Sequence, residues 1–296
     1  MKVVLLGYGE MGCTGLEFLL AQKETVASVI THRDDPKEKQ WYRSLAEVAA
    51  KANVPVRFSD DLDKDALYAV VQELKPDLIL SSYYRHMIPT KILKLAPKGA
   101  LNMHGSLLPR LRGRAPINWA LVECEEQCGV TLHHMVKGPD EGDIVGQRGW
   151  KIGPKETAKD LFDRAVVEAK ILLRDIWPKI QNGTAPRIPQ DSSKATYRGR
   201  RTPDDGRILW NLATKKIDGL VRAVTDPFPG AFTTLGGNKL MIWAGSPAPG
   251  TGTPGTLIDD NLVATGDGAY RIEKWNLAES ADRPALRKGT KLGEAP

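Results

Sequence analysis

The sequence has few cysteines and no long hydrophobic run, and both absences limit what the protein can be. The 296 residues include only three cysteines, Cys13, Cys124 and Cys128. This number is small and odd, so the cysteines do not form a disulfide framework. Cys124 and Cys128 lack further ligands at metal spacing, so we interpret them as packing residues and expect no metal site. The apolar run at the start ends in glycines after Leu6, unlike a signal peptide. No stretch approaches the roughly 18 apolar residues of a membrane span, so we expect a cytoplasmic protein without membrane insertion.

The excess of charge is also small. The chain has 42 basic and 36 acidic residues, a formal net charge of +6 that favours anionic ligands in general. The basic residues are spread along the chain, and no basic run is interleaved with aromatic residues, so we expect no nucleic-acid partner. A hydrophobic content of 41% is ordinary for a globular protein, and the length allows two domains.

Patterns of strands and helices alternate through the first half. Short apolar runs predict strands at 2–6, 25–31, 54–56, 77–81, 99–103 and 130–135. Apolar residues at three- and four-residue intervals predict helices at 12–21, 41–52 and 62–74, and a long helix at 157–180. Such alternation predicts an α/β fold with an open, mostly parallel, Rossmann-like sheet covered by helices on both faces.

The pattern changes after the long helix. Residues 191–206 are polar and contain Pro203, which indicates a linker between a catalytic domain at 1–190 and a smaller domain at 207–296. In that smaller domain a helix is expected at 213–224, and closely spaced strands at 231–235, 239–244, 255–258, 262–266 and 269–275 predict a β-barrel-like structure. The polar tail from Ala278 is expected to be poorly ordered.

A glycine motif near the N-terminus suggests a dinucleotide site. Gly7-Tyr8-Gly9-Glu10-Met11-Gly12 has the G-x-G-x-x-G spacing between a strand and a helix, and Asp34 and Asp35 follow about twenty residues on. The first strand-to-helix turn of any open α/β sheet also needs glycines for its tight geometry. We favour this structural interpretation and expect no NAD(P).

Polar side chains gather at the end of the fifth predicted strand. Asn102 and His104 are two residues apart in extended chain, so their side chains point to the same face, at the edge where open parallel sheets bind ligands. The loop Gly138-Pro139-Asp140-Glu141-Gly142 follows another strand and supplies carboxylates. A carboxylate beside an imidazole raises its pKa and fixes its tautomer. A histidine hydrogen-bonded at a strand end and a solvated acidic turn are the structural alternatives.

Together these segments resemble the folate-dependent formyltransferase family. The resemblance covers about residues 1–275 and is closest to the formyltransferase domain of the bifunctional polymyxin-resistance enzyme that acts on UDP-4-amino-4-deoxy-L-arabinose. The motifs that carry it are Asn102-x-His104, Ser106-Leu-Leu-Pro109, Arg112-Gly-Arg-Ala-Pro116, Asn118-Trp119, Gly129-Val-Thr-Leu-His133, Gly138-x-Asp140-x-Gly142, Arg200-Arg-Thr-Pro-Asp-Asp205 and Asp226-Pro-x-Pro-Gly230-Ala-Phe232.

The resemblance implies transfer of a formyl group from 10-formyltetrahydrofolate to an amine. Asn102 would hydrogen-bond the tetrahedral oxyanion, His104 would move the proton, and Asp140 would raise the pKa of His104 and orient it. The remaining histidines, His32, His133 and His134, have no such support and are interpreted as structural. The folate is expected to contact His86, Met87, Ile88, Arg114, Val136, Lys137, Gly138, Pro139 and Asp140.

The acceptor amine separates three hypotheses. A nucleotide-linked amino sugar implies a role in lipid A modification and polymyxin resistance, and Arg200–Asp205 either binds its phosphates or uridine or forms an ordinary charged cluster in the linker. Methionyl-tRNA formyltransferases usually carry a basic insertion after the second strand, whereas residues 32–39 here are few and of mixed sign. A non-catalytic folate- or nucleotide-binding module is the third, and the presence of Asn102, His104 and Asp140 together argues against it.

Overall fold

The chain divides into two compact units. The structure is a computed structural model that describes residues 1–36, 39–280 and 282–293. One unit comprises Met1–Gly113, Cys128–Trp150 and Asp163–Arg198, and the other comprises Arg114–Gln127, Lys151–Phe162 and Gly199–Pro296. Two short segments from the middle of the chain therefore group with the C-terminal residues.

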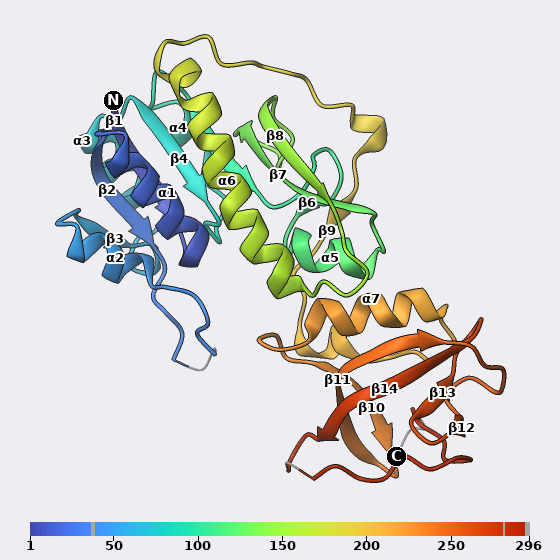
Figure 1. Cartoon of the computed structure of the whole chain (residues 1–296). Helices are drawn as coiled ribbons and strands as arrows, with labels where there is room; N and C mark the ends of the chain where they lie inside the picture. The colour runs from blue at the N-terminus through green and yellow to red at the C-terminus, as the bar shows by residue number, and fades with distance from the viewer. Residues whose placement is uncertain (37–38, 281, 294–296) are drawn as a thin grey trace. The chain divides into compact units, whose positions relative to one another are not determined.

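A seven-stranded sheet forms the centre of the first unit (Figure 1), in the order β3-β2-β1-β4-β5-β7-β8. The first five strands of that order are parallel, and β7 pairs with β5 in the antiparallel direction. This confirms the predicted α/β fold with a mostly parallel sheet. The strands are β1 (Lys2–Gly7), β2 (Thr25–Thr31), β3 (Val56–Phe58), β4 (Leu78–Ser82), β5 (Ala100–His104), β7 (Gln127–His134) and β8 (Ile144–Lys151).

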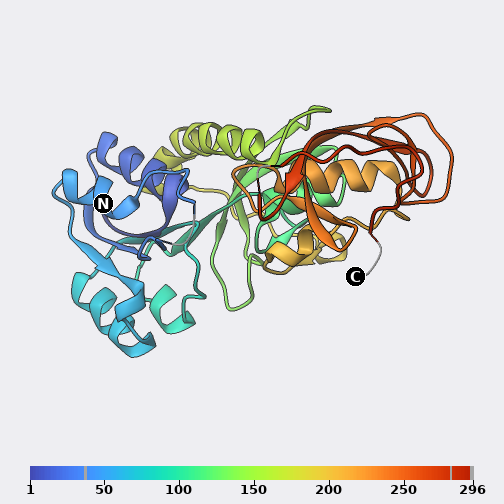
Figure 2. The ribbon, with the colours of Figure 1, turned by 90° about the horizontal axis from the view of Figure 1, so that it is seen from below.

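Helices cover both faces of this sheet (Figures 1 and 2). On one face α1 (Gly9–Ala21) and α6 (Ala158–Gln181) meet through an edge-to-face contact between Phe18 and Trp177, whose ring centroids are 5.4 Å apart. On the other face α3 (Lys64–Leu74) and α4 (Thr90–Leu93) pack on the strands. The buried cluster there is Val4, Leu6, Ile30, Leu67, Val71, Ile79, Ile88, Ile92, Leu93, Ala96 and Ala100. The short helix α2 (Leu45–Lys51) starts four residues later than expected.

The order of the strands reverses between β1 and β4, which lie side by side while their connections lead to opposite sides of the sheet. In open α/β sheets such a reversal opens a crevice at the carboxyl ends of the strands. Residues that follow β4 and residues at the end of β5 are therefore the first places to look for a site.

The second unit is built on a five-stranded antiparallel sheet in the order β10-β11-β14-β13-β12, which confirms a smaller C-terminal β domain. Its helix α7 (Thr214–Val224) packs on α5 (Pro116–Val122) at Gly219, where a Cβ would come within 2.3 Å of the Leu121 carbonyl oxygen. The strands are β10 (Ala231–Leu235), β11 (Asn238–Ala248), β12 (Leu257–Asp259), β13 (Leu262–Ala264) and β14 (Ala269–Leu277).

The polar C-terminal tail is more regular than predicted. Leu286 and Leu292 are buried. The carbonyl oxygen of Leu286 accepts a hydrogen bond from the Asn261 backbone, and Lys291 forms a β-bridge with Thr256. The expectation of poor order is therefore wrong for residues 282–293, because two leucines anchor an otherwise polar segment on the sheet.

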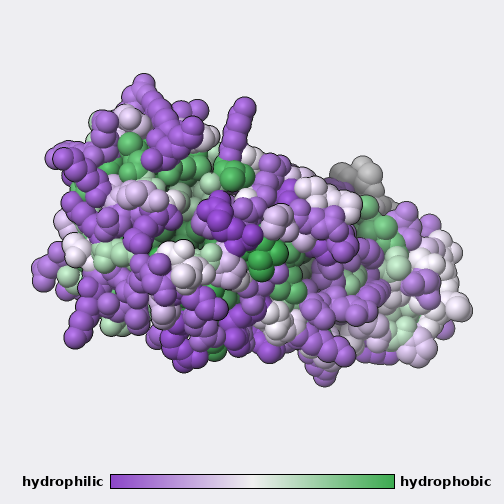
Figure 3. Space-filling model, turned by 90° about the horizontal axis from the view of Figure 1, so that it is seen from above, coloured by the Kyte–Doolittle hydropathy of each residue, from purple (hydrophilic) through white to green (hydrophobic). Residues whose placement is uncertain are grey.

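The surface is mainly hydrophilic on the face shown in Figure 3, with smaller hydrophobic areas between the polar side chains. Within the described residues, no helix combines the length and the apolar character that crossing a membrane requires.

Candidate active site

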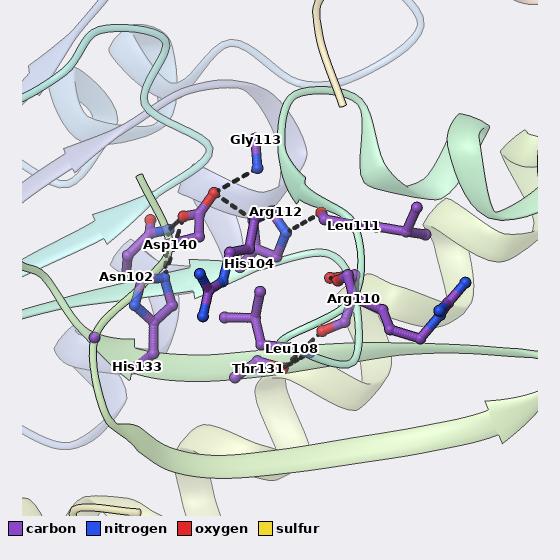
Figure 4. A network of polar contacts seen from close by, with 12 residues as sticks. Asn102, His104, Leu108, Arg110, Leu111, Arg112, Gly113, Thr131, His133 and Asp140 are labelled. Atoms are coloured by element: carbon purple, nitrogen blue, oxygen red, sulfur yellow. Dashed lines mark hydrogen bonds and ion pairs between the residues drawn. The ribbon is translucent and has the colours of Figure 1, made fainter. Parts of the chain in front are cut away.

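Strand β5 places Asn102 and His104 on the same face of the sheet, as their spacing predicts. β5 pairs with β4 on one side and with β7 on the other, which fixes the end of the strand. In the pairing with β7, Asn102 is in register with His133. His104 is 6% exposed, whereas Asn102 is only partly buried. Figure 4 shows both side chains directed toward Asp140.

The loop after β7 returns Asp140 to the end of β5. Asp140 has a φ of 56°, in the left-handed region that a non-glycine residue occupies only at a cost. At Gly142 a Cβ would lie 1.9 Å from the His134 carbonyl oxygen. The glycine therefore lets the loop turn closely under the end of β7, which brings the Asp140 carboxylate back over the sheet.

We expect Gly142→Ala to destabilise this loop. The new methyl group would collide with the backbone of His134, which cannot move aside as a flexible side chain can. The expected loss is about 1–3 kcal/mol of unfolding free energy, measured by urea denaturation. Gly199→Ala is the matched control, because its Cβ would meet nothing within 4 Å and its unfolding midpoint should be unchanged. Equal midpoints for both variants would contradict the assigned role of Gly142.

Three groups hold the Asp140 carboxylate. The backbone N–H of Gly113 donates to Oδ2 at 2.9 Å, Asn102 Nδ2 donates to Oδ1 at 3.3 Å, and His133 Nε2 lies 3.3 Å from Oδ1. Burial by itself raises the pKa of Asp140. The nearby His104 and His133 and the Gly113 N–H outweigh burial and hold that pKa well below its usual value, so the carboxylate is charged at neutral pH.

His104 is held through one ring nitrogen and faces Asp140 with the other. Nε2 lies 2.9 Å from the Leu111 carbonyl oxygen, and Nδ1 lies 3.6 Å from Asp140 Oδ2. Because a carbonyl oxygen can only accept, Nε2 carries a proton, and Nδ1 is the nitrogen left to gain or lose one. The loop that presents Leu111 is held in turn by Ser106, whose hydroxyl donates to the Arg110 carbonyl oxygen at 2.7 Å.

The charge state of His104 depends on burial and on its two charged or titratable neighbours. Burial lowers its pKa, Asp140 acts in the opposite direction, and His133 lowers it further. Asp140 therefore raises the pKa of His104, as the resemblance implies, but the net pKa is still below the ordinary value. The influence of the carboxylate has the predicted sign, but removal of the imidazolium from water is the larger effect. The resting side chain is therefore a neutral base.

His133 is a member of the cluster that the sequence prediction left out. Its Nδ1 donates to the His134 carbonyl oxygen at 2.9 Å, and its Nε2 lies 3.2 Å from Asn102 Nδ2. Asn102 Nδ2 and His133 Nε2 therefore lie beside each other, each 3.3 Å from Asp140 Oδ1. His133 lies beside Asn102 because β5 and β7 pair in the antiparallel direction in this register. The sequence predicts the strand at 130–135 but not the strand with which it pairs.

The predicted folate residues lie in two loops and the start of the second unit. His86 Nδ1 is 3.2 Å from the Ser59 hydroxyl, Met87 is 60% exposed, and Ile88 is buried in the cluster under α3 and α4. Val136, Lys137 and Pro139 are exposed, Gly138 is partly buried, and Met135 just before them packs on the same cluster as Ile88. Arg114 is exposed and belongs to the second unit.

The glycine motif and the Arg200–Asp205 run both have structural uses. At Gly12 a Cβ would come within 2.7 Å of Leu45 of α2, so this glycine permits close packing of α1. The guanidinium of Arg201 lies 4.6 Å above the Trp119 ring and donates to the Asp205 carbonyl oxygen at 2.8 Å. These contacts support the structural interpretation of Gly12 and of Arg201.

Both halves of the chain match models of one protein family. Residues 1–176 match the model described as formyl transferase, and residues 200–285 match the model of the formyl transferase C-terminal domain. The chain belongs to the formyl transferase family. The formyl transferase match to residues 1–176 contains Asn102, His104, His133 and Asp140.

Solved structures share this formyl transferase fold. An N-formyltransferase from Helicobacter canadensis, in complex with folinic acid and dTDP-3-aminofucose, is 20% identical with a TM-score of 0.73, over 93% of this chain and 100% of that chain. The methionyl-tRNA formyltransferase from Clostridium thermocellum is 18% identical with a TM-score of 0.56, over 85% and 95%. A variant of HypX from Aquifex aeolicus is 19% identical with a TM-score of 0.62, over 94% of this chain but only 44% of the HypX chain. At these identities the likeness concerns the fold.

Proposed function

We propose that the protein transfers the formyl group of 10-formyltetrahydrofolate to the amine of a nucleotide-linked amino sugar, with UDP-4-amino-4-deoxy-L-arabinose as the acceptor. The observation that carries the proposal is the convergence of Asn102 and His104 on Asp140, with distances of 3.3 Å and 3.6 Å, in a formyl transferase. An amide donor, a neutral imidazole and a charged carboxylate are the groups that acyl transfer to an amine requires.

In the proposed reaction the neutral amine attacks the formyl carbon and creates a tetrahedral oxyanion. One N–H of Asn102 turns from its partner in the cluster to stabilise that oxygen. His104 accepts the proton of the attacking amine at Nδ1, and the charge of Asp140 stabilises the imidazolium. The bond from carbon to N10 of the folate then breaks, and His104 returns the proton to N10.

The folate site is proposed at the two loops that border the cluster of Ile88. Met87 and Val136 are exposed apolar side chains, and apolar surface of this kind suits the flat ring of a pterin. The complete proposed set is His86, Met87, Ile88, Arg114, Val136, Lys137, Gly138, Pro139 and Asp140. The neighbour from Helicobacter canadensis, which contains folinic acid, supports a formyl-folate as the donor.

The acceptor is proposed from the same neighbour and from the segment after β2. That neighbour contains a nucleotide-linked amino sugar, dTDP-3-aminofucose. Residues 32–39 lack the basic character that tRNA recognition needs, although residues 37 and 38 lie outside the described part. His32 is buried, and the exposed Arg33 is paired with Asp61, which offsets its charge. An arabinose acceptor would place the protein in the cytoplasm, in lipid A modification and polymyxin resistance.

The test is release of tetrahydrofolate, followed by absorbance, with three acceptors side by side. We expect turnover with UDP-4-amino-4-deoxy-L-arabinose and at least about tenfold lower kcat/KM with other amino sugars and with methionyl-tRNA. Preference for methionyl-tRNA would replace the sugar by tRNA as the acceptor. Binding of folate without turnover of any acceptor would support the non-catalytic module instead.

A further inference from the structure

A segment that follows α6 supports the candidate active site. Ile188 and Ile144 exchange backbone hydrogen bonds of 2.8 and 3.0 Å, which fixes this segment to the start of β8. Further along, the two-residue strands β9 (Tyr197–Arg198) and β6 (Arg112–Gly113) pair in parallel. The chain between these two attachments crosses the loop that presents Asp140, and Gln190 lies in that stretch.

The side-chain amide of Gln190 holds the Asp140 loop through the backbone of that loop. Its Nε2 donates to the carbonyl oxygens of Asp140 at 2.8 Å and of Gly142 at 2.7 Å. Its Oε1 accepts from Arg112 Nε at 3.1 Å and from Nη2 at 2.8 Å. The amide is therefore saturated at both ends, and its orientation is fixed because reversing it would place an oxygen against two carbonyl oxygens.

Arg112 closes the arrangement into a ring. Its guanidinium is 3% exposed and donates from Nη1 to the Tyr197 hydroxyl at 2.7 Å, and that hydroxyl donates to Glu141 beside Asp140. The next residue, Gly113, gives the N–H that binds the Asp140 carboxylate. A buried cation is costly unless its N–H groups are satisfied, and here Gln190 and Tyr197 accept from the Arg112 guanidinium. The ring joins the backbone of residues 140–142 to the strand that binds the carboxylate.

We propose that Gln190 is a positioning residue that sets where the Asp140 carboxylate stands relative to His104. The loop has no regular backbone pairing of its own at Asp140, which stays in a left-handed conformation. Two hydrogen bonds from one rigid amide hold that conformation. Loss of Gln190 would let the loop relax, and a shift of about 1 Å at a catalytic group can cost about 10²-fold in rate. The inference rests on the proposed roles of His104 and Asp140.

The experiment is a double-mutant cycle between Gln190→Leu and Asp140→Asn. Gln190→Leu is expected to lower kcat by about 10–100-fold, with KM for 10-formyltetrahydrofolate changed by less than about threefold. If Gln190 acts through Asp140, the same change made in the Asp140→Asn enzyme lowers kcat by less than about threefold, because the two effects are not additive. Gln190→Glu is the second variant, since it keeps an acceptor for Arg112 while losing both donors, and a similar loss is expected.

The control is Gln181→Leu, which removes a hydrogen bond to Glu24 at the end of α6 and should leave kcat unchanged. A second readout needs no acceptor: the NMR titration of His104, which is faced by Asp140 and His133. In Gln190→Leu its pKa should fall, because the carboxylate moves away. An equal loss of kcat in both backgrounds, or an unchanged titration of His104, would overturn the proposal. Full activity of Asp140→Asn itself would instead overturn the proposed catalytic role of Asp140.

Discussion

Replacing His104 with alanine is expected to lower kcat/KM for formyl transfer by about 10²–10⁴-fold. The side chain is buried at the end of β5 and its Nδ1 is the only ring nitrogen left to accept a proton, since Nε2 is bound to the Leu111 carbonyl oxygen. Without it, the proton of the attacking amine has to leave through water. The measurement is steady-state release of tetrahydrofolate by wild-type and variant proteins with matched folding, checked by circular dichroism.

The pH dependence of the wild-type protein should identify the same group. Burial holds the pKa of His104 below its ordinary value of about 6.5, so the imidazole is neutral and active at all higher pH. Activity should be lost as pH falls through that lowered pKa, and the acidic limb of kcat/KM should disappear in the alanine variant. His134→Gln is the control, because His134 lies next in β7 and its ring nitrogen Nδ1 faces Arg187 at 3.4 Å. An unchanged rate in His104→Ala would remove His104 from the mechanism.

The second large effect is expected for Asp140→Asn, with kcat lowered by about 10²-fold. The substitution keeps the size of the side chain and removes the charge that stabilises the imidazolium of His104, 3.6 Å away. The same charge raises the pKa of His104 in the wild-type protein. The acidic limb of kcat/KM should therefore move to still lower pH in the variant, while the rate on the plateau falls.

Asp143→Asn is the matched control for this variant. Asp143 lies three residues further along the same loop and pairs with Arg187 at 3.4 Å, away from the cluster. Its removal should leave both the plateau and the acidic limb where they are. Should Asp140→Asn keep the wild-type rate, or should its acidic limb move to higher pH, the carboxylate would have no part in stabilising a charged His104.

The parallel sheet could be predicted because a parallel strand that is buried on both faces has an unbroken apolar sequence. β1, β2 and β4 are such strands, and their boundaries differ from the expected ones by a residue or less at most ends. β8 was not predicted because Ile144–Lys151 contains two glycines and alternating polar residues. These residues form a strand because they pair with β7 at the edge of the sheet. Helix α5 was missed because its seven residues begin at a proline in a segment that looks like a turn.

Contacts between segments that are far apart in the chain could not be predicted from the sequence. The spacing of Asn102 and His104 placed both on one face, since that needs only the local alternation of a strand. His133 and Gln190 join the site through a strand register and through a segment 50 residues beyond Asp140. Neither residue has neighbours in the sequence that would indicate a place in the active site. The net pKa of His104 was also out of reach, because burial depends on everything packed around it.

The most direct test of the central claim is the fate of a labelled formyl carbon. Wild-type protein would be incubated with 10-formyltetrahydrofolate labelled with carbon-13 in the formyl group and with UDP-4-amino-4-deoxy-L-arabinose, and the nucleotide sugar would be analysed by mass spectrometry. The account predicts a nucleotide sugar that has gained one labelled carbonyl, and almost none with His104→Ala under the same conditions. Labelled formate free in solution, with the sugar unchanged, would contradict it.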